Sequence, residues 1–199
     1  MSSNITYYFS VNSPWAYLGG QELARLARSY RANVHVKPIA LATVFPRTGG
    51  VPLHQRAAER QAYRFIELRR WRDVRGQRLV LEPQHFPAAE ATASKIILAA
   101  AAMHYDALRL ANAIHHALWA EDRNIADTPT LLEIAQRSGM DALGIIAKAR
   151  APDIQQRFED LTEEAIQKGV FGSPWYIHDN VPYFGQDRLS FLERALQSD

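Results

Sequence analysis

Strand-like segments are confined to the two ends of this 199-residue chain, and this distribution limits the folds that it can adopt. Near the amino end, residues 5–10 and residues 34–39 have the alternation and the aromatic or branched side chains of strands. Residues 15–30 between them carry apolar side chains at helical spacing. A strand, a helix and a strand in this order predict the opening unit of a parallel sheet. Strand signals return only at Trp175.

The long middle of the chain, from about residue 54 to residue 168, has an almost wholly helical pattern. Residues 45–52 precede it, hold two prolines and two glycines, and are expected to form a loop. A helical block between two strand-bearing segments is best explained as a domain inserted beside one sheet. We therefore predict an α/β fold with a discontinuous strand-bearing domain, residues 1–42 and 169–199, and an inserted helical domain, residues 43–168. Helix stops are expected at Gly76, 83–87, 127–129, Gly139 and Pro152.

The composition excludes several classes of protein. A hydrophobic content of 47% with 22% charged residues is ordinary for a globular protein and argues against disorder. The longest apolar run, residues 96–103, is too short to span a bilayer and is expected to be a core helix. Residues 1–4 lack the pattern of a secretory signal, so we expect a cytoplasmic protein with no membrane partner. The net charge of +2 makes nucleic acid a weak hypothesis, and no nucleic-acid partner is expected.

Two residue types bear directly on chemistry. The chain has no cysteine, which rules out disulfides and any thiol nucleophile of its own. The adjacent His115 and His116 point in different directions on a helix, and no neighbour has metal-ligand spacing, so no metal site is expected. Five arginines on an expected helix are interpreted as a solvated face with partly covered stems: Arg64, Arg69, Arg70, Arg72 and Arg75.

The junction at Ser13-Pro14, where the first strand runs into a helix, is where we expect the chemistry. Proline suits the first helical position, and the unpaired amides and dipole of a helix start favour a negative charge beside them. Ser13 lies where such an anion would be held. Its spacing alone also fits a plain N-cap, the commonest role of a serine before a helix.

A second motif lies near the carboxyl end. Residues 169–177 read as a loop, a proline at position 174 and a strand. A short strand and a glycine turn follow, and then a final helix, residues 187–196, with Asp187 at its start. This arrangement, with the Ser-Pro junction, resembles the thioredoxin-like superfamily, in which a cis-proline loop faces the first helix.

The resemblance is closest to the 2-hydroxychromene-2-carboxylate isomerases, which are sisters of the kappa-class glutathione transferases and relatives of the DsbA-like oxidoreductases. Three stretches carry it in the expected order: Ser-Pro-Trp-Ala-Tyr-Leu at 13–18, Ala-Glu-Asp-Arg-Asn-Ile-Ala-Asp at 120–127, and Val-Phe-Gly-Ser-Pro at 170–174 followed by Gly-Gln-Asp-Arg-Leu at 185–189. The resemblance implies a thioredoxin-like domain with a large all-helical insertion. It also implies a homodimer and glutathione as the cofactor.

The expected role of Ser13 follows from the missing cysteine. An enzyme that uses the sulfur of glutathione needs only a group that keeps this sulfur as a thiolate. A free thiol has a pKa of about 8.5, and lowering it by roughly two units requires about 2.7 kcal/mol. A hydrogen bond to a charged group contributes about 1.5 to 3 kcal/mol, and a helix terminus about 0.3 to 1. Ser13 is therefore predicted to donate to the glutathione sulfur.

The resemblance also implies how the rest of glutathione is held. Backbone groups of Ser173, before a cis Pro174, would pair with the extended tripeptide. The γ-glutamyl end would meet Gln186, Asp187 and Arg188, because helix-start amides suit its carboxylate and an aspartate suits its ammonium. A plain N-cap role for Asp187 stays open beside this one.

The second substrate implied by the resemblance is a small aromatic carboxylate, such as 2-hydroxychromene-2-carboxylate or its open-chain benzylidenepyruvate isomer. Here the sequence departs from the family, since the usual lysine and asparagine of the loop are Pro46 and Gly50. Arg47 and Arg56 are candidates for binding the carboxylate, although a loop arginine is more often only solvated.

Three functions from different classes remain open. The first is a glutathione-dependent isomerase of aromatic-degradation intermediates. The second is a glutathione transferase acting on another electrophile, and the third is a non-catalytic thioredoxin-like binding module. Net consumption of glutathione separates the first two, because an isomerase returns it. Retention of glutathione without turnover of any electrophile would favour the third.

Overall fold

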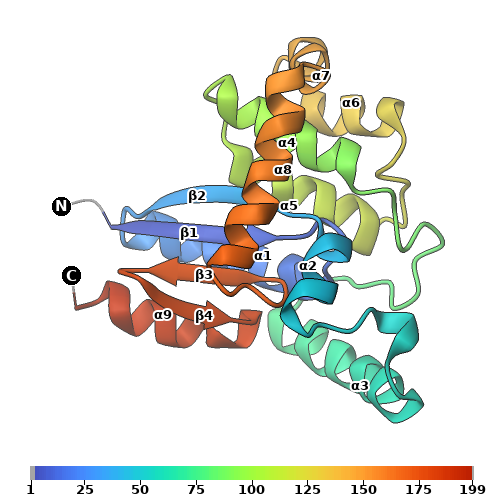
Figure 1. Cartoon of the computed structure of the whole chain (residues 1–199), viewed down its shortest axis with the longest axis vertical. Coiled ribbons are helices and arrows are strands. Elements are labelled where there is room, and N and C mark those ends of the chain that lie inside the picture. Colours follow the sequence, from blue (N-terminus) through green and yellow to red (C-terminus); the bar gives the residue numbers. More distant parts are fainter. Residues whose placement is uncertain (1–2, 199) are drawn as a thin grey trace.

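A four-stranded sheet joins the two ends of the chain in the computed structural model, which describes residues 3–198. The strands lie in the order β2 (Asn33–Pro38), β1 (Asn4–Phe9), β3 (Trp175–His178) and β4 (Val181–Phe184). β1 and β2 are parallel, whereas β3 is antiparallel to β1 and to β4 (Figure 1). The predicted parallel strand-helix-strand opening is thus confirmed. Residues 1, 2 and 199 lie outside the described residues. They include both outer ends of the predicted strand-bearing domain and the first two of the four residues that lack a secretory-signal pattern.

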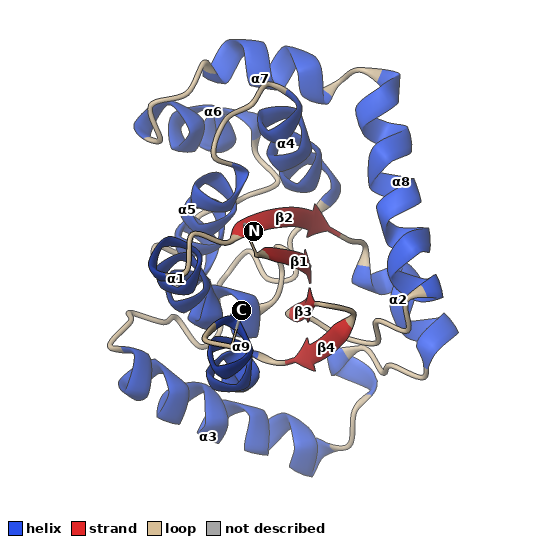
Figure 2. Ribbon diagram, turned by 90° about the vertical axis from the view of Figure 1, so that its left-hand side faces the viewer, coloured by secondary structure: helices blue, strands red, loops and turns tan. Residues whose placement is uncertain are grey.

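Helices surround this sheet on both faces (Figure 2). The helical middle of the chain is confirmed, with a further break at residues 103–106 that was not predicted. Asp106 ends this break by accepting a hydrogen bond from the amide of Arg109 at 2.9 Å, as an N-cap does. The division into a discontinuous domain and an inserted domain stays a prediction. The helices are α1 (Pro14–Ser29), α2 (Leu41–Thr48), α3 (Ala58–Arg75), α4 (Ala91–Ala102), α5 (Ala107–Trp119), α6 (Thr128–Arg137), α7 (Ala142–Ala149), α8 (Pro152–Gln167) and α9 (Leu189–Leu196), with short 3₁₀ helices η1 (Leu53–Gln55) and η2 (Gln186–Arg188).

The two faces of β1 enter different parts of the core. Ile5, Tyr7 and Phe9 lie in the larger hydrophobic cluster, with apolar residues of α1, α5 and α9. Tyr8 lies in a second cluster with Val44 of α2 and residues of α8. This alternation is the period of two that a strand imposes on its side chains. The end of β1, which leads to the Ser-Pro junction, is therefore fixed from both faces.

The expectation of a loop over residues 45–52 is wrong for its first four residues. They belong to α2, which contains Pro46 and ends at Gly49 in a left-handed conformation, φ 76°. The proline removes one backbone hydrogen bond, but Val44 is fully buried in the cluster that α2 shares with α8. Tertiary packing therefore outweighs the local preference, as it often does for short helices.

The apolar run at 96–103 is a core helix, as predicted. It forms most of α4, where Ile96 and Ile97 are buried. Within residues 3–198, none of the helices combines the length and the apolar character that crossing a membrane requires.

Candidate functional site

Ser13 caps the start of α1, directly after the end of β1. Its hydroxyl oxygen accepts a hydrogen bond from the amide of Ala16 at 3.2 Å, so the N-cap interpretation is confirmed. The same hydroxyl donates to the carbonyl oxygen of Ser173 at 3.0 Å. Ser13 is 5% exposed. Its single proton is thus shared with a backbone carbonyl, and it must turn away from that carbonyl to serve another acceptor.

The Ser173–Pro174 peptide bond is cis, as the family resemblance implied. Ser173 is held against the end of β1, because its hydroxyl oxygen accepts a hydrogen bond from the amide of Ser10 at 3.0 Å. On the other side, the carbonyl oxygen of Pro174 accepts from the amide of Gly185 at 3.0 Å. The proline loop is therefore tied both to the Ser13 junction and to the turn that precedes η2.

A partly buried carboxylate lies behind this junction, contributed by Glu90 just before α4. The Ser10 hydroxyl donates to it, and burial raises the pKa of the Glu90 carboxyl, although hydrogen bonds from Ser10, Leu41 and Asn12 oppose this effect. The Asn12 side chain pairs with the backbone of Ala88 in both directions at 2.9 Å. The segment before α4 is thus fastened to the residues that flank Ser13. No sequence pattern marked Glu90 as part of this region.

Gln186, Asp187 and Arg188 form η2, so the last helix begins with a 3₁₀ turn and not with a capped α-helix at Asp187. Gln186 is 2% exposed, whereas the side chains of Arg188 and Asp187 are 52% and 39% exposed and pair with each other at 3.4 Å. Gly19 of α1 lies against Gln186, since a Cβ atom at that glycine would come within 2.8 Å of the Gln186 Cβ. The close approach of α1 therefore positions η2 beside the first helix.

Arg75, at the end of α3, holds Gln186 in place. Its guanidinium donates to the side-chain oxygen of Gln186 at 2.8 and 3.0 Å and to the backbone oxygen at 3.1 Å. The Arg75 side chain is 19% exposed, so the prediction of a solvated arginine face is wrong at this position. The partners lie 111 residues apart, and helical spacing alone could not indicate this contact.

The two candidate carboxylate-binding arginines differ in their surroundings. Arg47 makes two hydrogen bonds to Glu163, at 2.5 and 3.0 Å, and both side chains are about half exposed. Arg56 follows η1, is partly buried, and donates from Nε to the carbonyl oxygen of Val51 at 2.8 Å. Burial lowers the pKa of Arg56, and the charge of Arg60 adds to this effect. Arg47 is thus already paired, whereas Arg56 has no ion pair within residues 3–198.

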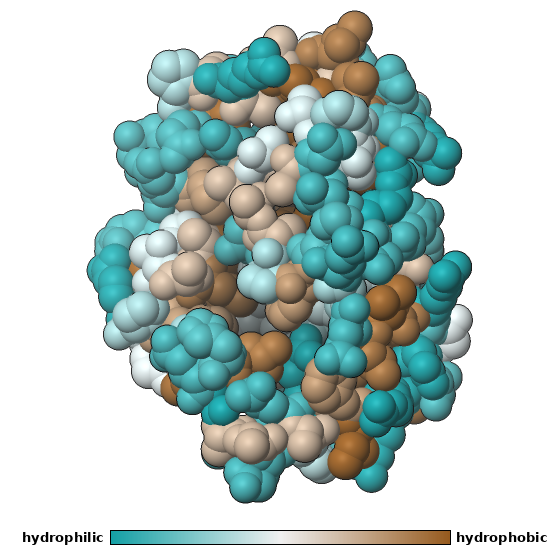
Figure 3. Space-filling view, turned by 90° about the vertical axis from the view of Figure 1, so that its right-hand side faces the viewer, coloured by the Kyte–Doolittle hydropathy of each residue, from teal (hydrophilic) through white to brown (hydrophobic). Residues whose placement is uncertain are grey.

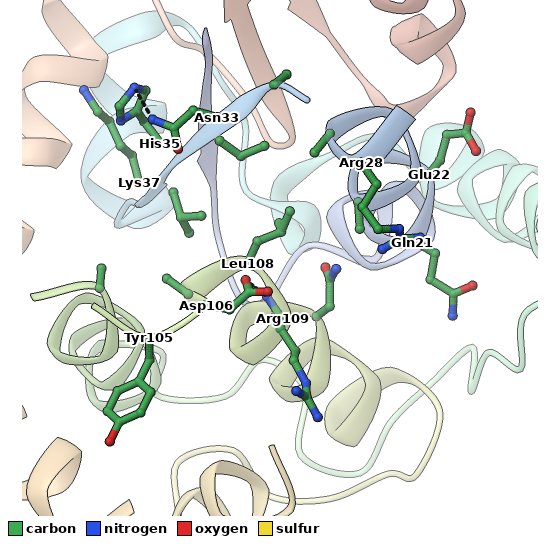
Figure 4. Close-up of a pocket in the computed structure, with 18 of the residues that line it drawn as sticks. Gln21, Glu22, Arg28, Asn33, His35, Lys37, Tyr105, Asp106, Leu108 and Arg109 are labelled. Atoms are coloured by element: carbon green, nitrogen blue, oxygen red, sulfur yellow. Dashed lines mark hydrogen bonds between the residues drawn. The ribbon is translucent and has the colours of Figure 1, made fainter. Parts of the chain in front are cut away.

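A wide cavity lies elsewhere in the molecule. It has a volume of about 1260 Å³ and opens along β2 between α1, α4, α5 and α8 (Figure 4). Arg28, Lys37 and Arg109 line it, but none of the site residues predicted from the sequence does. Within the described part of the chain, no group of three or more His, Asp or Glu side chains is placed to hold a metal ion.

The Ser13–Pro14 junction and the cis-proline loop lie where β1 ends, on the side of the molecule on which α2 and α3 also lie (Figure 1). Figure 3 looks onto this side and shows apolar patches between hydrophilic ones. Near it, Phe171 precedes the proline loop and contacts the rings of Trp175 and Phe184 edge-on, with ring centroids 4.8 and 4.7 Å apart. Phe171 and Phe184 are both 43% exposed, so aromatic surface is available beside Ser173.

The sequence matches a known protein family over almost its whole length. The model of the DSBA-like thioredoxin domain matches residues 4–197, almost the whole chain. The chain belongs to the DsbA-like thioredoxin family. The resemblance found in the three sequence stretches is thereby confirmed, and so is the α/β, thioredoxin-like fold class.

Individual relatives of this DsbA-like protein are named as enzymes. A 2-hydroxychromene-2-carboxylate isomerase of Sphingobium xenophagum is 28% identical over 198 residues, which cover 98% of this chain and 99% of the relative. A solved structure of a 2-hydroxychromene-2-carboxylate isomerase superposes with a TM-score of 0.82 at 25% identity, covering 98% of this chain and 95% of that one. The human glutathione S-transferase kappa 1 is 23% identical over 211 residues, 96% of this chain and 90% of the relative.

Proposed function

We propose that this DsbA-like protein is a glutathione-dependent isomerase that interconverts 2-hydroxychromene-2-carboxylate and trans-o-hydroxybenzylidenepyruvate, or a similar aromatic-degradation intermediate. The observation that carries the proposal is the 3.0 Å hydrogen bond from Ser13 to the carbonyl before cis-Pro174, in a chain without cysteine. A hydroxyl stands at the helix start where a redox enzyme would need its own thiol. Isomerases of this name that align over nearly the whole chain support the same reading.

In the proposed complex, hydrogen bonds to glutathione replace the hydrogen bond between Ser13 and Ser173. The Ser13 hydroxyl turns from the Ser173 carbonyl to the glutathione sulfur and stabilises it as a thiolate. The released carbonyl of Ser173 then accepts a hydrogen bond from a backbone amide of the extended tripeptide. The number of hydrogen bonds is kept, so the burial of Ser13 in the unliganded state is compatible with this role.

The γ-glutamyl end is assigned to η2. Gln186 is buried and held by Arg75, so it fixes the position of the turn, whereas Arg188 is exposed and Asp187 partly exposed, so that these two offer both charges. The ammonium suits Asp187, and the carboxylate suits Arg188 and the amides of the helical turn. Arg75 supports the assignment by fixing Gln186 from behind.

The reaction needs a nucleophile that is later returned. The chromene ring first opens: the bond between its ring oxygen and C2 breaks, the proton of the 2-hydroxyl group passes to the released phenolic oxygen, and C2 becomes a ketone. The thiolate then adds to the carbon next to the aromatic ring, forming a carbon–sulfur bond while the electron pair of the double bond moves towards the ketone oxygen. The resulting single bond rotates. The electron pair then returns, the carbon–sulfur bond breaks, and glutathione is regained as the thiolate, so that Ser13 stabilises the nucleophile at the beginning and at the end.

The carboxylate of the substrate is assigned to one of two arginines, Arg47 in the last turn of α2 or Arg56 after η1. Of the two candidates, Arg56 is the better placed, because the charge of Arg47 is already neutralised by Glu163. A partly buried guanidinium without an ion pair gains more from an incoming carboxylate than an exposed, paired one does.

A spectrophotometric assay of the chromene-carboxylate interconversion, with and without added glutathione, tests the proposal. We expect interconversion that depends on glutathione and leaves its concentration unchanged. No interconversion by folded protein at saturating glutathione would contradict the proposal.

The second candidate function is a kappa-class-like glutathione transferase, which the similarity to the human kappa enzyme favours. A transferase forms a stable adduct and consumes one glutathione for each product. Titration of the remaining thiol during turnover therefore separates the two functions.

A further inference from the structure

A pair of arginines at the start of α3 has no acidic partner among residues 3–198. Arg56 follows η1, and Arg64 lies two turns into α3. Both side chains are partly buried. Three other arginines of intermediate burial, Arg25, Arg75 and Arg123, are each paired with an acid. This pair is therefore unlike the ordinary ion-paired surface of the protein.

Arg64 contacts aromatic rings in place of a carboxylate. The central carbon of its guanidinium lies 5.7 Å from the centroids of the Phe65 and Phe86 rings. Phe86 in turn packs on the buried Trp119, with ring centroids 5.0 Å apart. A guanidinium stacked on rings keeps its N–H groups free at its edge, and such an edge matches the two oxygens of a carboxylate.

The charged form of Arg64 is disfavoured where no anion lies beside it. Burial lowers the pKa of Arg64 to about 10, and the charge of Arg56 adds to this effect. Two like charges that repel each other in a partly dehydrated place are costly unless an anion joins them. The predicted solvated arginine face is confirmed at the exposed Arg69 and Arg70 but is wrong at the partly buried Arg64 and Arg75.

Arg64 is linked to the Ser13 junction through Phe86 and the two residues that follow it. Phe86 is followed by Pro87 and Ala88, and the backbone of Ala88 makes two hydrogen bonds with the side chain of Asn12. Asn12 directly precedes Ser13. The segment that carries the Phe86 ring is therefore hydrogen-bonded to the residue that precedes Ser13.

We propose that Arg64, together with Arg56, forms the binding site for the carboxylate of an aromatic carboxylic acid, with the Phe86 ring lying beneath the bound acid group. The inference rests on the proposed function for the location of the reacting sulfur, and it names the residue that replaces the missing family lysine. Arg64 comes from α3, so a search of the loop at residues 45–52 could not find it.

Direct binding of chromone-2-carboxylate, measured by calorimetry without glutathione, tests this assignment. The neutral chromone-2-carboxamide serves as the matched ligand. We expect the wild type to prefer the carboxylate, and Arg64→Gln to weaken carboxylate binding about 10- to 100-fold while leaving the carboxamide unchanged. Arg64→Lys should fall between the two, since a lysine keeps the charge but loses the planar fork.

Arg69→Gln, an exposed change on the same helix, is the control and should bind like the wild type. Equal carboxylate affinity in Arg64→Gln and the wild type would overturn the assignment, and so would an equal loss in Arg69→Gln or a wild type without preference for the carboxylate. Weaker glutathione binding by Arg64→Gln, with the probe unaffected, would also overturn it. If the proposed function were wrong and this assignment right, the wild type would still prefer the carboxylate, but it would show no glutathione-dependent turnover.

Discussion

The hydroxyl of Ser13 and the carbonyl oxygen of Ser173 lie 3.0 Å apart, although 160 residues separate them in the chain. The contact brings the start of the first helix and the cis-proline loop together, and both groups can turn to a ligand that enters between them.

The hydroxyl of Ser173 stabilises the fold through the amide of Ser10. In Ser173→Ala this buried amide loses its acceptor, so we expect the free energy of unfolding to fall by about 1 to 3 kcal/mol. Urea unfolding measures the change. Ser138→Ala is the control, because the Ser138 hydroxyl only adds a second bond to the carbonyl of Ile134. Equal losses in both variants would contradict the special role of the Ser10–Ser173 bond.

Arg75 is expected to act on glutathione binding through Gln186. Arg75→Ala removes three hydrogen bonds that fix Gln186, so the KM for glutathione should rise about 10-fold while kcat changes little. Steady-state kinetics with varied glutathione measure both constants. Arg72→Ala, which removes an exposed arginine paired with Asp73, should leave both constants unchanged. A loss confined to kcat would place Arg75 outside the glutathione site.

Arg47 and Arg56 should differ in their effect on the aromatic substrate. Arg56→Ala is expected to raise the KM for the carboxylate substrate about 10-fold, because a desolvated cation is lost. Arg47→Ala should change it less than about twofold, since Glu163 already pairs with Arg47 and the pair is exposed to solvent. The reverse order would restore Arg47 as the replacement for the family lysine.

His115 makes the protein sensitive to acid. Burial lowers the pKa of His115 from 6.5 to about 4, although the Ser10 carbonyl opposes the shift. The unfolded chain therefore takes up a proton near pH 6.5 that the folded protein refuses until about pH 4. The stability from this residue is complete above pH 6.5 and is lost as the pH falls towards 4, at about 1.4 kcal/mol per pH unit.

His115→Gln should flatten this dependence, because glutamine can still donate to the Ser10 carbonyl but does not titrate. Urea unfolding between pH 7 and pH 5 measures the slope. The exposed His54→Gln should keep the slope of the wild type. An unchanged slope in His115→Gln would show that another group controls the loss of stability in acid.

The parts of the site that follow local rules could be predicted from the sequence. The helix start at Ser13, the strand after Pro174 and the turn before Gln186 each depend on a few consecutive residues, and the structure has them all. The cis state of Pro174 was expected from the family resemblance and not from local preference, since most such bonds are trans.

Long-range pairing could not be predicted in this way. Helical spacing shows that Arg64 and Arg75 lie on α3, but it does not show that the ends of their side chains meet Phe86 and Gln186. The helical state of Pro46 depends likewise on the burial of Val44 against α8, a segment more than a hundred residues later. The roles of the predicted site residues and the expected homodimer stay predictions.

The most direct test of the account is the pKa of the glutathione thiol when it is bound to the protein, followed by the ultraviolet absorbance of the thiolate. The wild type should lower this pKa by about two units from its free value near 8.5, and Ser13→Ala should return it by about one to two units. Ser138→Ala should titrate like the wild type. An identical pKa of the bound glutathione thiol in the wild type and in Ser13→Ala would contradict the claim that Ser13 stabilises the thiolate of glutathione.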